Sequence, residues 1–157
     1  MLTLSVNTYT AIVVKNIPDS PSRAVYFSLM KSADIFGGDF ARLFREHGIT
    51  STVFNAMRIL IQGPEEGQRI GEIGRQLIQR VPDITRLIDR MERDGLVRRA
   101  RDADDRRAVT IRLTSHGRRK CEDLYPDVSK RHKGQLSHMS ERDLKQLHKL
   151  LEKAMQP

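Results

Sequence analysis

The sequence predicts a mainly α-helical chain of 157 residues that carries one small β-hairpin. Several segments repeat apolar residues at helical spacing, most clearly residues 81–97. Two short segments, 96–100 and 108–113, read as paired strands on either side of the charged stretch RDADDRR. At this length a single domain buries roughly 70% of the surface that its unfolded chain exposes. We therefore expect one domain, with an N-terminal arm at 1–19 and the remainder at 20–157.

The first helix is predicted over about 20–47. It follows a β-leaning run, YTAIVV, that Pro18 ends and that we interpret as an arm or short strand. Pro21 suits the first helical position, and Gly48 suits the stop. The Gly37-Gly38 pair is expected to kink or break this helix. Seven of its residues fall near one face: Val25, Leu29, Phe36, Phe40, Leu43, Phe44 and His47.

The middle of the chain predicts three helices and one very short strand. Thr50 can cap a helix that ends at the loop GPEEG, and residues 68–70 can form the short strand. A short helix is expected at 71–78, with Leu77 and Ile78 among its apolar residues. The next helix has Pro82 and Asp83 in its first turn and stops at Gly95. Its buried stripe has i, i+3, i+4, i+7 spacing: Ile84, Leu87, Ile88 and Met91.

Two further helices are predicted after the hairpin. One begins near Ser115 and contains Pro126, which we expect to kink it. The last begins after Ser140, whose spacing to Asp143 resembles a capping box. Its apolar stripe is Leu144, Leu147, Leu151 and Met155.

The basic residues concentrate in one quarter of the chain. The formal net charge is +8 and the pI is about 10.1. Residues 80–120 hold 13 Arg and Lys against seven Asp and Glu, and 12 of the 13 are Arg. Arginine suits planar, bidentate recognition of phosphates and guanine edges, so this excess favours a polyanion partner.

Other classes of protein find little support. A single cysteine excludes an intramolecular disulfide, and the histidines lack the spacing of a zinc helix. The acidic DADD stretch lacks the further oxygen ligands of a cation site. We see no nucleophile with a neighbouring base and no phosphate-binding glycine loop, so neither an enzyme nor a cofactor is expected. No apolar run is long enough for a membrane span and the N-terminus is unlike a signal peptide, so we expect a cytoplasmic protein.

Two short helices followed by a hairpin describe a winged helix-turn-helix. The second helix of such a unit can enter a major groove, while the hairpin tip reaches the flanking minor groove or phosphates. If its stripe faces the core, the opposite face presents Pro82, Arg86, Asp89, Arg90 and Arg93, with Thr85 at the border. The alternative is that this basic face is merely solvated, and the neighbouring Arg-rich hairpin argues against it.

These motifs resemble the MarR family of bacterial winged-helix transcriptional regulators. The resemblance runs from about residue 30 to 155 and includes GITSTVFNAMRIL. Its most specific part is TRLIDRMERDGLVRR, followed by a D-x-x-DRR wing and a strand ending in LT-x-x-G. The corresponding residues are Asp102, Asp105, Arg106, Arg107, Leu113, Thr114 and Gly117.

The resemblance implies a homodimer on a palindromic DNA operator. Dimerisation helices would lie at about 20–47 and 115–156, with the winged helix-turn-helix at about 50–114. One of Arg106 and Arg107 would reach DNA and the other would pair with Asp89 or Asp105; the sequence leaves the assignment open. The expected DNA-binding residues are Pro82, Asp83, Thr85, Arg86, Asp89, Arg90, Arg93, Arg101, Arg106 and Arg107.

The resemblance also suggests a repressor whose DNA affinity a small aromatic ligand modulates. Neighbours of such a ligand would be Phe40, Phe44, Met57 and Arg58, although each also suits the core or the surface. Some relatives sense oxidants through a cysteine near the first helix, and this chain has none there. Cys121 is interpreted as a buried, inert thiol, with redox sensing as the lesser hypothesis. The alternative function is a winged-helix module that binds an acidic protein without specific DNA readout.

Overall fold

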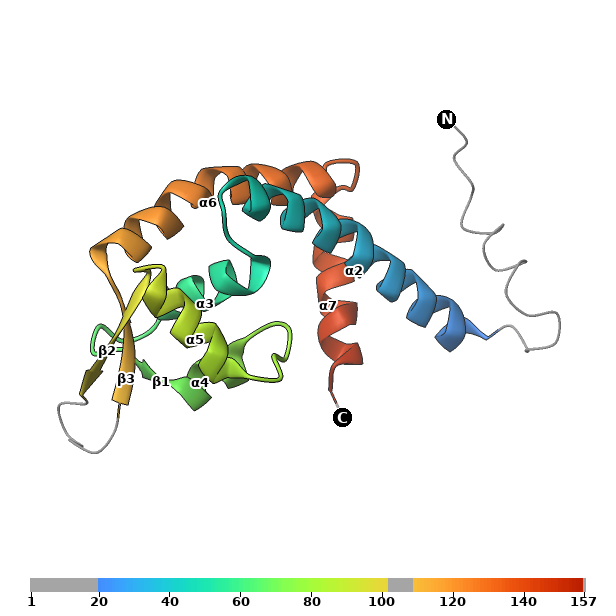
Figure 1. Ribbon diagram of the computed structural model, residues 1–157. Helices are drawn as coiled ribbons and strands as arrows, with labels where there is room; N and C mark the ends of the chain where they lie inside the picture. The colour runs from blue at the N-terminus through green and yellow to red at the C-terminus, as the bar shows by residue number, and fades with distance from the viewer. Residues whose placement is uncertain (1–19, 102–108, 157) are drawn as a thin grey trace. The chain divides into compact units, whose positions relative to one another are not determined.

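The computed structural model describes residues 20–101 and 109–156. In chain order these form the helices and strands of Figure 1: α2 (Pro21–Glu46), α3 (Ser51–Gln62), β1 (Gln68–Arg69), α4 (Ile70–Gln76), α5 (Ile84–Arg93), β2 (Val97–Arg101), β3 (Val109–Leu113), α6 (Ser115–Gln135) and α7 (Glu141–Ala154). The mainly helical fold with a small sheet is confirmed. The expected arm at 1–19 and the tip of the hairpin, with Arg106 and Arg107, lie outside the described residues.

The chain divides into two compact units, 1–37 and 38–157, and each is described by itself. Helix α2 continues through Gly37 and Gly38, so the expected break in the helix is wrong. Glycine costs only about 1 kcal/mol per residue in a helix, which the helical residues on either side can offset. In the first unit, Tyr26 and Phe27 meet edge to face, and the Arg23 guanidinium lies 5.7 Å from the centre of the Phe27 ring.

The core of the second unit surrounds α3. Six apolar side chains of this helix are buried: Val53, Phe54, Ala56, Met57, Ile59 and Leu60. The predicted cap is confirmed, because the Thr50 hydroxyl accepts a hydrogen bond from the Val53 N–H (3.2 Å). The Phe44 ring stacks on Phe54 at 4.6 Å between centroids, which joins the end of α2 to α3.

The sheet is antiparallel, with strand order β1-β3-β2. The very short strand expected near residue 68 is confirmed as β1, in which Gln68 lies opposite Ile111. Strands β2 and β3 pair from Val97 with Leu113 to Arg101 with Val109. The side chains of Ile111 and Val97 are buried on the side of the sheet that faces the core.

Two predicted helix boundaries shift. Helix α4 ends at Gln76 and not at residue 78, because the Ile78 N–H donates to the Asn55 side-chain oxygen (3.0 Å). Leu77 is buried as expected, but the Ile78 side chain is 81% exposed. Helix α5 begins at Ile84, since Asp83 is its N-cap and accepts a hydrogen bond from the Arg86 N–H (3.0 Å). Pro82 and Asp83 therefore precede the first turn of α5.

The hairpin leads directly into α6. The Thr114 hydroxyl accepts from the Gly117 N–H (2.9 Å), which caps α6. Pro126 lies inside α6 and does not end it. The predicted cap of α7 is confirmed, with the Ser140 hydroxyl accepting from the Asp143 N–H (3.2 Å). Within the described residues, no helix is both long and apolar enough to cross a membrane.

Candidate nucleic-acid interface

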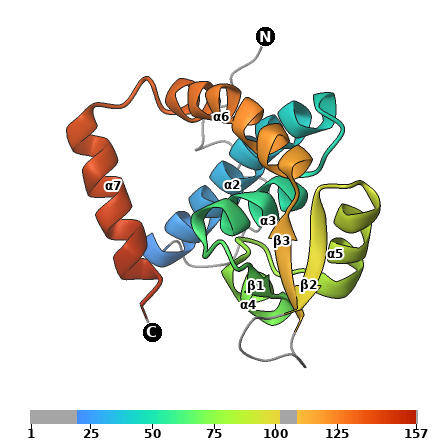
Figure 2. The same cartoon turned by 90° about the vertical axis from the view of Figure 1, so that its left-hand side faces the viewer.

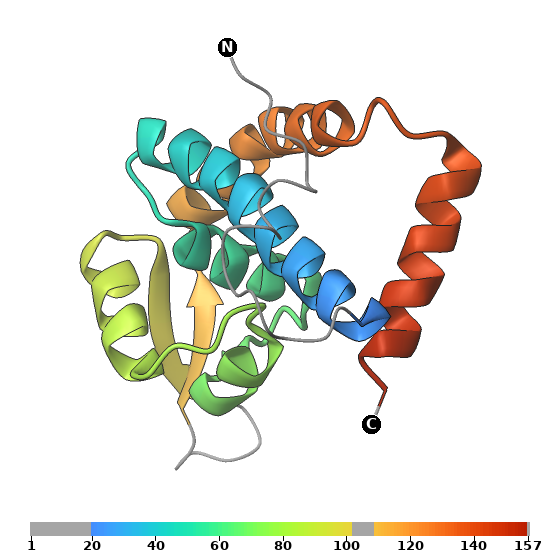
Figure 3. The same cartoon turned by 90° about the vertical axis from the view of Figure 1, so that its right-hand side faces the viewer.

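Helix α5 presents the face that the sequence predicts. Ile88 and Met91 are fully buried, and Ile84 and Leu87 are half-buried against the core. The opposite face is exposed: Thr85, Arg86, Asp89, Arg90 and Arg93. Figure 2 shows α5 alongside β2, with α4 near β1 at the foot of the sheet, and Figure 3 shows α5 and β2 side by side from the opposite direction. The helix thus lies between the core and solvent, with its arginines outward.

This face forms an open concave surface of about 790 Å³. Residues of α5 and of the turn before it contribute most of the lining, joined by Thr50, which caps α3, and by Thr52 of α3. Neither threonine was predicted for this surface, because their proximity to α5 is a property of the fold. The Arg90 guanidinium reaches the Thr50 hydroxyl at 3.4 Å and so connects the two helices. The lining is Thr50, Thr52, Val81, Pro82, Asp83, Arg86, Leu87, Asp89, Arg90 and Arg93.

Asp83 has two structural tasks at this surface. Its carboxylate caps α5 and also forms an ion pair with the Arg86 side chain at 3.1 Å. The Arg86 side chain is 87% exposed, so this pair is weak and can exchange for a contact with another anion.

Arg99 of β2 is the main residue that sequence reasoning missed. Its guanidinium forms ion pairs with Asp89 (2.6 Å) and with Glu92, and its backbone N–H donates to Glu92 (3.0 Å). The hydrogen bond that the guanidinium donates to Asp89, followed by its interactions with Glu92, raises the pKa of Arg99 above its ordinary value, although partial burial opposes the shift. The strand is thereby fastened to α5. Alternation along β2, which puts Val97 and Arg99 on one side, is the signal that could have found it.

The expected pairing of Asp89 involved Arg106 or Arg107, which lie outside the described residues. In the structure, Asp89 forms an ion pair with Arg99 instead. Arg101, the last residue of β2, is exposed where the hairpin leaves the sheet. Helix α5 and the base of the hairpin therefore both carry exposed arginines.

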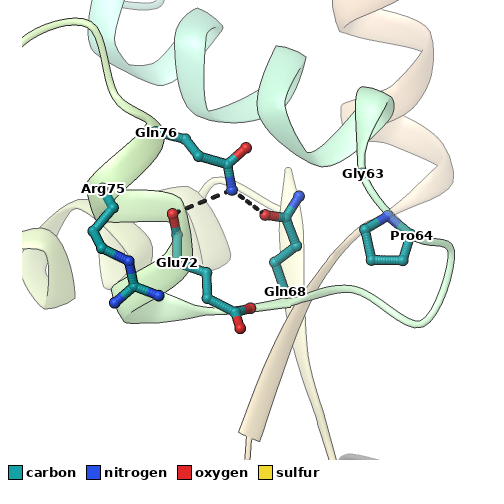
Figure 4. Close-up of a pocket in the computed structure, with 6 residues that line it drawn as sticks. All are labelled: Gly63, Pro64, Gln68, Glu72, Arg75 and Gln76. Atoms are coloured by element: carbon teal, nitrogen blue, oxygen red, sulfur yellow. Dashed lines mark hydrogen bonds between the residues drawn. The ribbon is translucent and has the colours of Figure 1, made fainter.

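A second concavity, of about 380 Å³, lies at the end of α3 beside β1 and α4 (Figure 4). The side chains of Gln68 and Gln76 form hydrogen bonds within its walls. Gln76 donates to the Gln68 side-chain oxygen (2.5 Å) and to the Glu72 carbonyl (3.2 Å), and Gln68 donates to the Ile59 carbonyl (3.1 Å). A Cβ on Gly63 would lie 2.0 Å from the Gln68 amide nitrogen, so a larger residue there would displace the Gln68 side chain. This network fixes α4 to the end of α3.

The four expected ligand neighbours do not line either of these concavities. Phe44 and Met57 are core residues, with 4% and 0% exposure. Phe40 is half-buried between Phe44 and the ring of His132, which lies 4.6 Å away. Arg58 is half-buried and donates to the Gln62 side chain at 2.6 Å. In this single chain the four residues pack against the protein itself.

Cys121 is fully buried on α6, as expected. Burial, and to a lesser degree the Glu122 charge, raise the pKa of its thiol to about 11, while Arg58 acts in the opposite direction. Thiolate, the reactive form, is therefore scarce at neutral pH. Among the described residues, His, Cys, Asp and Glu form no group of three or more that could hold a metal ion.

Helices α4 and α5 are followed directly by the antiparallel hairpin of β2 and β3, and α5 has three outward arginines. This arrangement defines a winged helix-turn-helix protein. A family model described as "MarR family" matches residues 49–109, which span α3 to the start of β3. The chain belongs to the MarR family, whose members are DNA-binding transcription regulators and not enzymes.

Similar proteins support this membership. The uncharacterized HTH-type transcriptional regulator YkoM of Bacillus subtilis is 33% identical over 111 residues, which cover 70% of each chain. The HTH-type transcriptional regulator TtmR of Methylorubrum extorquens is 36% identical over 101 residues, 64% of this chain and 51% of that protein. The chain thus aligns with about half the length of the latter. The crystal structure of a MarR transcription factor from Planctomyces limnophilus is 32% identical with a TM-score of 0.65, covering 87% of this chain and 98% of that one.

Proposed function

We propose that this protein is a dimeric, sequence-specific DNA-binding regulator that reads a palindromic operator through α5. One observation carries the proposal: Arg86, Arg90 and Arg93 project from a single exposed face of a helix whose other face is core. Arginine on such a face suits the acceptor pair of guanine in the major groove. Arg101, Arg106 and Arg107 of the hairpin would contact the flanking backbone or minor groove.

The remaining residues of the face have subsidiary roles in this proposal. Thr85, near the N-terminal end of α5, would meet a phosphate or a base edge. Pro82 and Asp83 set where α5 begins, and Asp83 would release Arg86 to DNA. Asp89 forms an ion pair with Arg99 through one carboxylate oxygen. It would contribute to base recognition only if its other oxygen accepts a hydrogen bond from a cytosine amine.

Footprinting on the DNA beside its own gene, followed by substitution of Arg86, tests base reading. Arg86→Ala is expected to lose about 1–3 kcal/mol of discrimination at one position of each half-site, because a base contact disappears. Arg101→Ala serves as the matched control and should weaken binding evenly across sequences. Equal, sequence-independent losses in both variants would refute the assigned role of α5 and favour a module that binds acidic proteins.

We further propose that two copies associate through the first and last helices, so that two α5 helices match half-sites about one helical turn apart. The apolar residues of α2 and α7 support this. Val25, Tyr26, Phe27, Met30 and Ile35 of α2 are each more than half exposed in the single chain. No residue of α7 is buried, although the helix has an apolar stripe.

The protein is proposed to act as a repressor that a small ligand releases from DNA. A curated relative named homoprotocatechuate degradative operon repressor, 28% identical over 90 residues, supports repression. Phe40 and Arg58, the two half-buried members of the expected ligand set, would meet such a ligand at the edge of the core. Gel shifts with and without aromatic carboxylates test this; DNA affinity that no such acid lowers would contradict ligand release.

A further inference from the structure

Two arginines face each other across the hairpin. Arg98 of β2 lies directly opposite Arg112 of β3 in the strand register. Residues paired in this way have Cβ atoms about 4.5–5.5 Å apart, and like charges at that distance destabilise a sheet. The next residue along β2, Arg99, has two carboxylate partners. Arg98 and Arg112 form no ion pair with any carboxylate of the described residues.

Arg112 is held in place without an acceptor. Its Nε is buried and has no hydrogen-bond partner in the structure. The loop before β1 packs over its aliphatic stem, because a Cβ on Gly67 would lie 2.7 Å from Arg112 Cγ and 2.5 Å from the Ile111 carbonyl oxygen. Gly67 has a φ of +90°, a conformation that glycine adopts without strain. A buried donor without a partner is costly, so its presence calls for a reason.

The two arginines lie apart from the α5 surface. Side chains alternate along a strand, so Arg98 points to the opposite side of the sheet from Arg99, which contacts α5. Arg98 is exposed, and Arg112 is half-buried. An anion held here would therefore be different from any that Arg86, Arg90 or Arg93 contacts.

We propose that Arg98 and Arg112 form an oxyanion site that takes a phosphate group. Two adjacent guanidinium groups offer several N–H donors in planar forks that match phosphate oxygens. A bound phosphate would remove the repulsion between the two charges and supply a charge partner beside the buried Nε of Arg112. Local conflicts of this kind are expected at functional sites. The phosphate is either one of the DNA backbone, a case that rests on the proposed function, or a free phosphate.

Charge reversal at Arg98 separates this site from a merely solvated pair. Arg98→Glu would place a carboxylate opposite Arg112, so the unliganded protein should melt at a higher temperature than wild type while anion binding is lost. A variant that is more stable but no longer binds the anion indicates a ligand site. A purely structural role of Arg98 would instead make the variant less stable. Arg119→Glu on α6 is the matched control, because Arg119 is exposed, has no carboxylate partner within 4.0 Å among the described residues, and gives the same change in net charge.

Two binding measurements identify the source of the phosphate. With duplex DNA, Arg98→Glu should lower the slope of log affinity against log salt by about one relative to Arg119→Glu if a backbone phosphate occupies the site. With inorganic phosphate at matched ionic strength, the melting temperature of wild type but not of Arg98→Glu should rise if the ligand is free phosphate. The proposal fails if neither assay separates the two variants, or if Arg98→Glu lowers stability, which would mean that Arg98 already has a charge partner. Arg86→Ala in the same DNA assay reports on the proposed function separately.

Discussion

Arg99 decides the charge of the α5 surface. Asp89 lies on the exposed face of α5, where an unpaired carboxylate would repel the phosphates of a duplex. The guanidinium of Arg99 neutralises it at 2.6 Å and also holds Glu92, one turn further along α5. The same residue therefore shapes both the local packing of β2 on α5 and the net positive charge of the surface.

Arg99→Ala is expected to weaken DNA binding more than it weakens folding. The ion pairs are about one-third to one-half exposed, so their loss should lower the free energy of unfolding by only about 1 kcal/mol. The released Asp89 carboxylate should lower DNA affinity, and the double variant Arg99→Ala/Asp89→Asn should recover part of it. Fluorescence anisotropy on a labelled duplex measures this coupling. A double variant that binds no more tightly than Arg99→Ala would show that repulsion by Asp89 is not the cause.

The buried thiol of Cys121 should make stability depend on pH. The pKa is about 11 in the folded chain, above the value of about 8.5 for an exposed cysteine. Between these values the unfolded chain has lost a proton that the folded chain keeps, so stability falls as pH rises.

At pH 10 the stability of wild type relative to pH 8 should fall by about 2 kcal/mol more than that of Cys121→Ala. Urea unfolding at both pH values gives the comparison, in which other titrating groups cancel. Parallel losses in the two proteins would contradict the raised pKa of the buried thiol.

The junction of the hairpin with α6 explains the LT-x-x-G motif at the level of elements. Thr114 donates to the Gly95 carbonyl (2.6 Å) and caps α6 through the Gly117 N–H. The first turn of α6 lies so close to the start of β2 that a Cβ on Gly117 would be 2.0 Å from the Leu96 carbonyl oxygen. The motif thus fastens α6 to the turn that follows α5.

Gly117→Ala should destabilise the protein by about 2 kcal/mol, because the added methyl group forces backbone apart. Gly134→Ala, on the same helix, meets nothing within 4 Å and should stabilise it by up to about 1 kcal/mol. Chemical unfolding of both variants provides the measurement. Equal effects from the two substitutions would mean that the close approach at Leu96 is absent.

Much of the element order could be predicted, because local chemistry sets it. Thr50 and Ser140 cap helices as their sequences indicate, and the apolar spacing of α5 orients its arginines correctly. The predicted end of α4 was wrong because the Ile78 N–H donates a hydrogen bond to Asn55, which lies 23 residues earlier in the chain. Likewise the Arg99 contacts depend on how β2 lies against α5, and the Thr50 contact depends on how α3 approaches it. Such long-range partners leave no periodic signal in the sequence.

At the scale of the whole molecule, the exposed apolar residues call for a partner surface. Tyr26, Phe27 and Met30 of α2 are 59%, 52% and 54% exposed, and α7 has Leu150 at 56%. Large apolar side chains gathered on a helix in this way mark an association surface more often than a free one. A second copy of the chain would cover them in the proposed dimer.

Sedimentation at micromolar concentration should therefore show a dimer, and Phe27→Glu should shift it to monomer, because a carboxylate in an apolar interface is costly to desolvate. Ser28→Glu adds the same charge at the neighbouring exposed position and should leave the dimer intact. A monomeric wild type, or dissociation of both variants alike, would refute association through α2.

The two ion pairs that Arg99 forms with Asp89 and Glu92 have a mechanical consequence for the molecule. Two attachment points one helical turn apart oppose a rotation of α5 about its own axis independently of β2. A tilt of the hairpin would then tend to turn the helix with it, which would couple the orientation of the three outward arginines to the sheet.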